Sequence, residues 1–353
     1  MKRLRRILVR AVAVIVAVTI AFGLVLMGGK AFFFARRQLT CEEYYSAYVP
    51  LGGTEQYVAV RGDAEGDILL WVHGGPGSPL SPVAYTFGEQ LERDYLVVHW
   101  DQRGSGRSWF EDSAAVSPSQ LLGDLAELVE WLCDRYARQR VVLVGYSFGT
   151  ALCLQYAAAH PERVAAYVAV SQVTDLMQSV ALSAGRVLDD PDVTEAAAAA
   201  LRSGMDTLLG DGEDPVAHIM AYRRLQGLCA KYFPAGKGDA GNLFWAGAFS
   251  PDCGVRDMAW KLLQMSPACF ATYGDTMQWL FLEFRADSVD RLEVPVLFIS
   301  GEHDYITPPD TVAAYAAVLD APSVTHTVLE DCAHSPFFDD PVAFAACIRE
   351  FVR

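Results

Sequence analysis

The sequence predicts an α/β protein with a mostly parallel sheet, a helical insertion and a separate apolar helix at its amino terminus. From Asp67 onward, short apolar runs alternate with longer amphipathic runs, which is typical of βα units. That alternation stops between residues 172 and 290, where the runs are helix-like and no strand is indicated. We therefore expect a membrane anchor at 1–37, a core in two parts at 38–171 and 291–353, and a helical cap at 172–290.

The amino-terminal segment has the features of a membrane span. An uncharged run extends from Ala11 to Gly29, and at about 1.5 Å per helical residue it spans about 28 Å, close to the ~30 Å hydrocarbon core of a bilayer. Five basic residues precede the run and three follow it, which places the amino terminus in the cytoplasm and the rest of the chain outside. A cleaved signal peptide is the alternative, with Ala21-Phe-Gly23 as its small-residue site.

Charge and cysteine usage exclude some classes of protein. Residues 38–353 carry 20 Lys and Arg against 43 Asp and Glu, a formal charge of −23, and such a surface repels nucleic acid. The eight cysteines form no CxxC pair, so we expect mostly buried free thiols. Disulfides among Cys229, Cys253 and Cys269 stay open as an alternative, because an outward-facing domain lies in an oxidising environment.

The individual elements follow from the apolar pattern. We expect strands at 68–72, 95–100, 141–144, 166–170, 295–300 and 325–329, and part of an antiparallel hairpin at 56–60. Helices are expected at 119–136, 150–159, 309–319 and 341–352, each with a Ser, Asp or Pro start signal. The insertion contributes helix-like runs at 193–209, 216–232 and 269–284.

The stretch Gly145-Tyr-Ser-Phe-Gly149 joins a predicted strand to a predicted helix and matches the GxSxG nucleophile elbow. The serine of such an elbow has a strained backbone, so only small residues fit two positions before and after it. The turn lifts the Ser147 hydroxyl above the sheet and leaves the Phe148 N–H at a helix start. Ser147 is the candidate nucleophile.

A serine nucleophile needs a base and an orienting carboxylate. In the elbow arrangement, the acid and then the histidine follow later strands; Asp304 comes just after the strand at 295–300 and His334 just after the strand at 325–329. Asp304 could instead form a turn or cap a helix, and the nearby Glu302 is the alternative candidate for the orienting carboxylate. Chain order and loop position together favour Asp304 and His334 as the pair.

The sequence around His303 raises the question of a metal site. His303 lies between Glu302 and Asp304, but consecutive residues of a short loop cannot all face one ion, and no second cluster completes a ligand set. We expect neither a metal nor a cofactor.

Two further motifs follow the first two strands of the parallel part. His73-Gly-Gly-Pro-Gly77 can direct a backbone N–H at the oxygen that Phe148 faces, and we expect that of Gly75 to do so. Asp101-Gln-Arg-Gly-Ser-Gly-Arg-Ser108 lacks the Lys-Ser/Thr of a phosphate loop. We expect a tight structural loop there, with Arg103 and Arg107 as charged supports.

In this order HGGPG, DQRGSGRS, GxSxG, GEHD and AHSP resemble the α/β-hydrolase fold and, within it, the proline iminopeptidase family of serine aminopeptidases. The resemblance covers about residues 45–353. It implies a triad of Ser147, Asp304 and His334, an oxyanion hole made by Gly75 and Phe148, and a helical cap. It also implies release of an amino-terminal residue, with proline as the candidate, from short peptides through an acyl-enzyme.

The chain also departs from that family. Members with proline iminopeptidase activity typically have Gly-Gly-Ser-Trp-Gly at the elbow, where this chain has Tyr146 and Phe148, and Ala333 replaces the usual glycine before the histidine. These differences put a strict proline preference in doubt and make Tyr146 a candidate substrate contact. The family's cap holds the substrate's amino group through acidic side chains, for which Glu283 is the candidate here.

Three alternatives therefore stay open. A cap pocket without a positioned carboxylate would favour an ester, lipid or thioester substrate with unchanged chemistry. The second alternative is not an enzyme but an inactive binding protein with the same fold. The cap aromatics are expected in the cap core, with pocket lining as the alternative: Trp245, Trp260, Trp279, Phe281 and Phe284.

Overall fold

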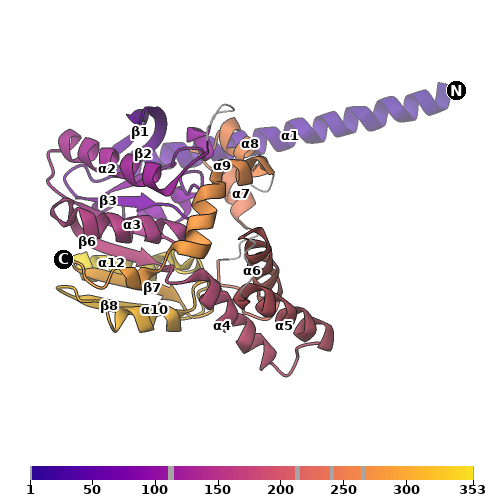
Figure 1. The fold of residues 1–353 in the computed structure, drawn as a ribbon. Coiled ribbons are helices and arrows are strands. Elements are labelled where there is room, and N and C mark those ends of the chain that lie inside the picture. The colour runs from indigo at the N-terminus through magenta and orange to yellow at the C-terminus, as the bar shows by residue number, and fades with distance from the viewer. Residues whose placement is uncertain (1, 110–114, 211–214, 239–241, 264–266, 353) are drawn as a thin grey trace.

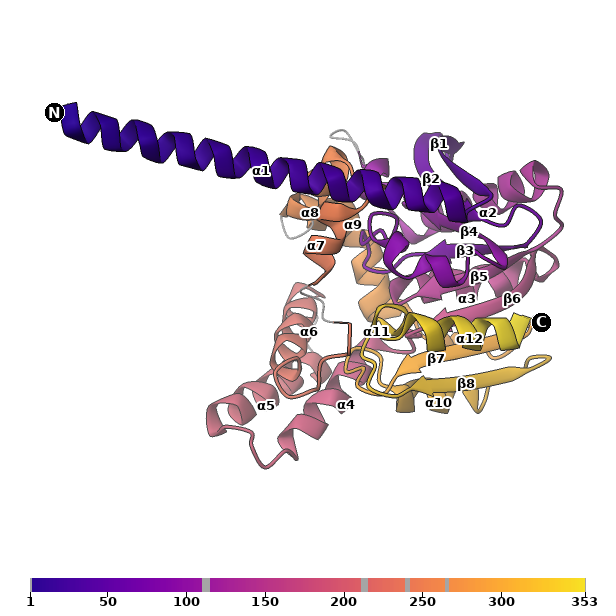
Figure 2. The ribbon, with the colours of Figure 1, turned by 180° about the vertical axis from the view of Figure 1, so that it is seen from behind.

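The computed structural model describes residues 2–109, 115–210, 215–238, 242–263 and 267–352. An eight-stranded sheet of order β1-β2-β4-β3-β5-β6-β7-β8 forms its centre (Figures 1 and 2). Its strands are β1 Glu43–Leu51, β2 Thr54–Gly62, β3 Asp67–Val72, β4 Tyr95–Trp100, β5 Val141–Tyr146, β6 Val164–Val170, β7 Val296–Gly301 and β8 Val324–Leu329.

Six of the strands are parallel, and the hairpin of β1 and β2 joins them antiparallel to β4. In a parallel sheet the carboxyl ends of the strands meet at one edge, where the loops that follow β3, β5, β7 and β8 come together. All six parallel strands and the strand at 56–60 were predicted to within a few residues. The prediction missed β1, whose alternating exposed and buried residues include the polar Ser46 and Glu43.

The side chains of each strand alternate between two apolar layers. On one face Leu70, Leu143 and Tyr167 pack against α2 (Pro118–Arg135), α3 (Phe148–Ala159) and α10 (Pro309–Ala316). On the other face Trp71 and Val144 pack against α12 (Pro341–Val352), the short α11 (Pro336–Asp339) and the segment around Phe87. Helices on both faces explain why the strands are almost continuously apolar.

Between β6 and β7 the described residues form helices, as the sequence predicts, and project from one side of the sheet (Figure 1). The limits of the cap at residues 172 and 290 stay a prediction. Its helices are α4 Leu176–Leu188, α5 Glu195–Leu209, α6 Pro215–Cys229, α7 Asn242–Phe249, α8 Val255–Leu263 and α9 Pro267–Gln278, followed by the π-helical turn η5 Trp279–Glu283.

A single helix, α1 (Lys2–Thr40), contains the predicted span and continues beyond it. Within the described residues it is the one helix long and apolar enough to cross a membrane, over Val9–Thr40. Its carboxyl-terminal part lies against the domain, where Arg37 forms a buried ion pair with Glu92 and Arg36 an exposed one with Glu89. The other part projects away from the domain (Figure 2).

The cysteines agree with the expectation of free thiols where they are described. Seven are unpaired, and all of these except Cys347 are buried. Cys229 and Cys253 are among them, so neither forms a disulfide. The side chain of Cys269 lies outside the described residues.

Candidate active site

The elbow between β5 and α3 has the geometry that its glycines predict. Ser147 has φ +50° and ψ −123°, a conformation that costs about 1–3 kcal/mol and persists only where the surroundings hold it. A Cβ on Gly149 would lie 1.9 Å from the Val72 carbonyl oxygen, and one on Gly145 would lie 2.9 Å from the Thr150 Cα. The helix therefore starts so close to β3 that only glycine fits.

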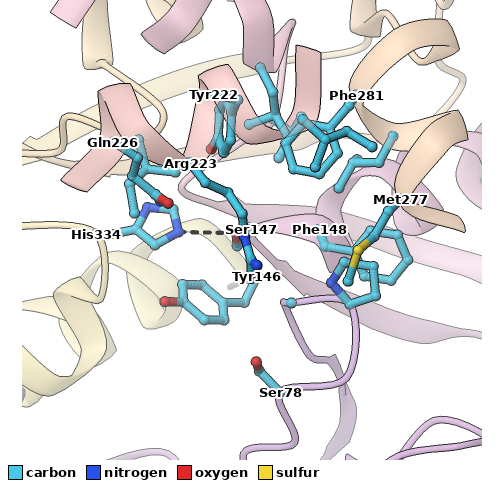
Figure 3. Close-up of a pocket in the computed structure, with 17 residues that line it drawn as sticks. Ser78, Tyr146, Ser147, Phe148, Tyr222, Arg223, Gln226, Met277, Phe281 and His334 are labelled. Atoms are coloured by element: carbon cyan, nitrogen blue, oxygen red, sulfur yellow. Dashed lines mark hydrogen bonds between the residues drawn. The ribbon is translucent and has the colours of Figure 1, made fainter. Parts of the chain in front are cut away.

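The loops after β7 and β8 bring the predicted acid and base to Ser147. Nδ1 of His334 lies 2.9 Å from Oδ2 of Asp304, and its Nε2 lies 3.0 Å from Oγ of Ser147 (Figure 3 shows this second contact). An ionised carboxylate can only accept, so Nδ1 carries the proton and Nε2 accepts from the serine hydroxyl. The three side chains form one continuous chain of hydrogen bonds.

Asp304 is held in a fully buried, fully bonded position. Its Oδ1 accepts from the backbone N–H groups of Ile306 and Thr307 at 2.9 and 3.0 Å, and its Oδ2 accepts from the Thr307 hydroxyl at 2.7 Å. Burial by itself would raise the pKa of Asp304, but the charge of His334 and the hydrogen bonds from His334 and Thr307 outweigh it and hold the pKa below 3.8. The carboxylate is thus ionised at neutral pH.

The Tyr146 side chain packs against the imidazole of His334. Its ring centroid lies 5.4 Å from that of His334 and 4.9 Å from that of Phe337, which it meets edge-on. Its hydroxyl lies 2.7 Å from Oγ of Ser335, and burial raises its pKa above the ordinary value. Tyr146 also lines the cavity above Ser147, so it is placed to touch both the histidine and a ligand.

The loop after β3 packs directly on the elbow. A Cβ on Gly74 would lie 3.0 Å from the Ser147 Cβ. Gly75 has φ +118°, and a Cβ there would lie 2.6 Å from the Gly77 nitrogen, so both its conformation and its surroundings require glycine. Gly75, Ser147 and Phe148 all line the same cavity.

His73 ties this loop to the next one. Burial lowers its pKa to about 4, so the ring is neutral at neutral pH. Its Nε2 lies 3.2 Å from the Gln102 backbone N–H and accepts from it, which leaves Nδ1 to donate to the Gly74 carbonyl at 2.8 Å. The histidine of HGGPG therefore positions the loop and does not face the cavity.

The arginines of the second loop pair with carboxylates, as their predicted role requires. Arg103 donates to both oxygens of Asp124 at 2.5 and 2.6 Å, and Arg107 Nε donates to Asp257 of α8 at 2.9 Å. Asp101 of the same loop accepts from the Ser81 hydroxyl and from the Arg107 backbone N–H. Burial, and then the charge of Asp257, raise the pKa of Asp101 to about 7.

A cavity of about 400 Å³ opens above Ser147, under the cap (Figure 3). Helix α6 contributes a stripe at i, i+3, i+4 and i+7, and the sequence predicted this helix but not which face turns inward. The described lining residues are Gly75, Pro76, Ser78, Tyr146, Ser147, Phe148, Val173, Leu176, Ile219, Tyr222, Arg223, Gln226, Met277, Leu280, Phe281, Ile306 and His334.

The lining is mostly apolar, and it contains no carboxylate among the described residues. Among the described lining residues Arg223 is the one arginine or lysine, and its side chain extends from α6 toward Ser147 (Figure 3). The cavity is large enough for a small ligand, and its described walls offer apolar contacts and a positive charge.

The expectation that Glu283 binds the substrate's amino group needs a correction. The side chain is exposed and lies outside the cavity lining, because η5 turns Phe281 toward the cavity and buries Leu280, leaving Glu283 in solvent. Of the five cap aromatics, Trp260 and Phe284 are buried in the core, Phe281 lines the cavity, Trp279 is partly buried against the core and Trp245 is half exposed.

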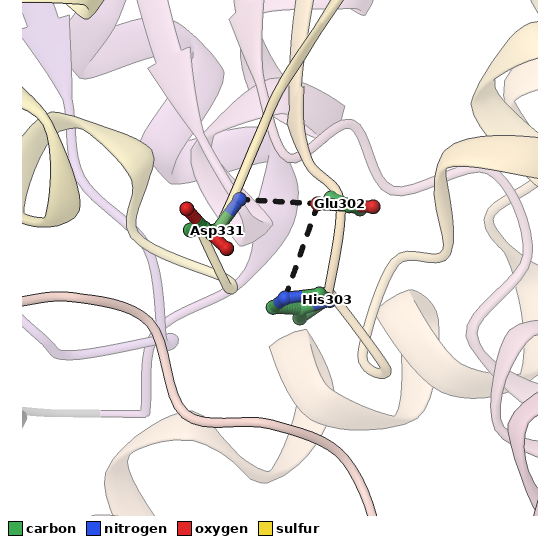
Figure 4. Close-up of side chains that lie close together, drawn as sticks. All are labelled: Glu302, His303 and Asp331. Carbon is green, nitrogen blue, oxygen red and sulfur yellow. Dashed lines mark hydrogen bonds and ion pairs between the residues drawn. The ribbon is translucent and has the colours of Figure 1, made fainter.

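The loops after β7 and β8 also bring together Glu302, His303 and Asp331, whose ligand atoms lie within 4.8 Å of one another (Figure 4). The sequence did not indicate Asp331 because it follows a different strand. Glu302 accepts from the Asp331 backbone N–H at 3.1 Å, and the Asp331 carboxylate pairs with Lys237 at 3.0 Å. These contacts join the two loops and explain why the three side chains lie close together.

The fold and this arrangement of side chains define the class of the protein. The family model described as alpha/beta hydrolase fold matches residues 67–341, and the chain belongs to that family. It is similar to the probable aminopeptidase YbaC of Bacillus subtilis (strain 168), at 26% identity over 309 residues that cover 86% of this chain and 94% of that protein.

Other relatives match a shorter part of the chain. The proline iminopeptidase of Neisseria gonorrhoeae is 31% identical over 125 residues, which cover 35% of this chain and 38% of that protein. Among solved structures, the proline iminopeptidase of Mycobacterium smegmatis superposes with a TM-score of 0.61 at 20% identity, covering 87% of this chain and 97% of that one. At that identity the likeness shows the fold alone.

Proposed function

We propose that this protein is a serine hydrolase in which Ser147 attacks a substrate carbonyl. The observation that carries the proposal is the hydrogen-bonded chain from Asp304 through His334 to Ser147, at 2.9 and 3.0 Å, beneath a cavity open to a ligand. His334 takes the serine proton as the Oγ–C bond forms, and Asp304 stabilises the imidazolium.

The tetrahedral intermediate places a negative charge on the carbonyl oxygen. Backbone N–H groups of Gly75 and Phe148 are the proposed donors to it, since both residues line the cavity next to Ser147. His334 then gives its proton to the leaving group, which departs and leaves an acyl-enzyme. Water, deprotonated by the same histidine, releases the acyl group and restores the serine.

The first candidate substrate is a short peptide or amino-acid amide with a free amino terminus, cleaved after its first residue. This rests on the similarity to an aminopeptidase over 94% of that relative's length. Proline as the preferred residue rests only on relatives matched over shorter stretches.

The second candidate is an ester or thioester, and the composition of the cavity favours it. An ammonium group on the substrate calls for a nearby carboxylate. The described lining supplies none, and Arg223 adds a positive charge instead.

We also propose that α1 anchors the protein in a membrane with the hydrolase domain outside. The basic residues before the apolar run set this orientation. A cleaved signal peptide is the alternative, but cleavage at Ala21-Phe-Gly23 would leave residues 24–35, which are apolar except for Lys30, attached to the domain.

The test compares prolyl, alanyl and other aminoacyl amides with short acyl esters, using the full chain and a Ser147→Ala variant. The exposed Ser203 provides the matched control variant, Ser203→Ala. We expect Ser147→Ala to lose turnover and fluorophosphonate labelling while Ser203→Ala keeps both. Turnover of esters alone would exclude the peptidase, and an unlabelled, inactive wild type would point to a binding protein.

A further inference from the structure

Cap helix α7 contacts the apolar part of α1, and α8 follows α7 in the chain. Figures 1 and 2 show both cap helices on the side of the domain from which α1 projects. The Phe22 and Trp245 rings meet edge-on with centroids 6.2 Å apart, and Phe249 fills the space beside Gly29. Lys30, the first charge after the apolar run, donates to the Cys253 carbonyl at 2.7 Å. α7 thus contacts α1 over two turns within the uncharged run.

These contacts fix the depth of α7 relative to α1. From Lys30 back to Phe22 the helix rises about 12 Å, whereas the headgroup region on each side of a bilayer is only about 5–8 Å thick. A membrane that covers the uncharged run of α1 therefore also reaches α7. The sequence of α7, Asn242–Phe249, contains no charged residue, and tryptophan, as at position 245, is enriched at the membrane interface.

Helix α8 continues this surface with one apolar face turned to solvent. Val255 is 87% exposed, Leu262 80% and Met258 38%, at the i, i+3, i+7 spacing of one helix face. The opposite face is fixed to the domain: Asp257 pairs with Arg107, and Trp260 donates to the Gly77 carbonyl at 2.8 Å.

The exposed charges of α8 are basic in an otherwise acidic protein. Arg256 and Lys261 are exposed beside the apolar residues, while the one acidic residue of α8, Asp257, is turned inward to Arg107. Apolar residues flanked by Arg and Lys are the composition of helices that lie in the plane of a membrane interface.

We propose that the α7–α8 surface, formed by Trp245, Val255, Met258 and Leu262, lies in the interface of the bilayer that α1 crosses. The occupant of this surface is lipid, with Arg256 and Lys261 at the level of the headgroups. The ion pairs of Arg36 and Arg37 join the end of α1 to the domain, so the anchor holds the cap close to the membrane. The inference rests on α1 being the anchor and is independent of the reaction at Ser147.

The test measures the depth of single labelled positions in the full chain, reconstituted at one chain per lipid nanodisc. Cysteine variants Val255→Cys and Leu262→Cys carry an environment-sensitive NBD dye. Val318→Cys is the matched control, since Val318 is also exposed, at 68%, and follows α10 on the other part of the domain. Labelled wild type gives the background from the native thiols, and Val18→Cys reports insertion of α1.

We expect doxyl lipids to quench the dye at 255 and 262 about threefold or more over that at 318, as for side chains buried 5–10 Å into the interface. Iodide, which stays in the water, should quench the dye at 318 more strongly than the dye at 255 and 262. Equal iodide quenching at 255 and 318, with position 18 inserted, overturns the proposal and leaves the anchor standing. If doxyl lipids do not quench the dye at position 18, both the proposal and the anchor role of α1 are overturned. Protection of 255 that appears only at high protein density in vesicles assigns the surface to a second copy of the chain instead.

Discussion

Gly149→Ala tests the steric account of the elbow. The added Cβ would lie 1.9 Å from the Val72 carbonyl oxygen and 2.8 Å from that of His73, whereas Cβ contacts below 3.0 Å essentially never occur. Helix α3 and the end of β3 must therefore separate by roughly 1 Å, a strain in the range of about 1–3 kcal/mol or more for an overpacked core. The same shift moves Gly74, which packs against Ser147.

Gly123→Ala is the matched control. Gly123 is exposed in α2, and an added Cβ would have nothing within 4 Å, so alanine should stabilise the helix by up to about 1 kcal/mol. The free energies of unfolding of the two variants should differ by about 2–4 kcal/mol.

Denaturant unfolding of the full chain in detergent measures this difference, and fluorophosphonate labelling reports on Ser147. We expect Gly149→Ala to lose both stability and labelling. If it unfolds at the wild-type denaturant concentration and labels at the wild-type rate, the close approach of α3 to β3 does not set the geometry of the elbow.

Three further predictions concern the acid, the cavity and a buried histidine. Asp304→Asn should lower kcat by roughly 10³–10⁴-fold by leaving the imidazole in the wrong tautomer, while Asp310→Asn, on the surface, should leave kcat unchanged; equal kinetics would remove Asp304 from the mechanism. Glu283→Gln should leave KM within about twofold, because no direct contact is lost; a large rise in KM for aminoacyl amides alone would restore the amine-binding role. Burial, with the charges of Arg61 and Arg37, lowers the pKa of His99 to about 3, so the unfolded chain binds a proton below pH 6.5 that the folded chain refuses. For this reason the free energy of unfolding should fall by about 2 kcal/mol between pH 8 and pH 5. His99→Phe should remove this decrease, as measured by denaturant titrations at the two pH values. An unchanged pH dependence of the free energy of unfolding in the variant would contradict the prediction.

Much of the site was predictable because its residues have local requirements. The elbow needs glycine at 145 and 149 for reasons that lie within a few residues and one neighbouring strand. Asp304 and His334 follow strands whose apolar runs are visible in the sequence, and parallel strands bring the following loops to one edge. The placement of these residues near Ser147 therefore follows from chain order and strand pattern.

The lining of the cavity was not predictable in the same way. Helix α6 was expected, but which of its faces turns toward Ser147 depends on how the cap packs on the sheet, and Tyr222 and Arg223 line the cavity only through that packing. Glu283 was favoured because it is acidic and lies among aromatics, yet η5 turns it to solvent. Position 331 approaches Glu302 and His303 only because two loops meet.

The sequence by itself determined the α/β class, the positions of most strands along the chain, the candidate nucleophile with its acid and base, and the apolar helix at the amino terminus. These depend on hydrophobic period, on glycine sterics and on chain order, all of which are local. The tertiary structure alone decided the polarity of the cavity, the solvent position of Glu283 and the contact of α7 with α1. Each of these depends on how surfaces distant in the sequence pack together, and a linear pattern carries no information about which faces meet.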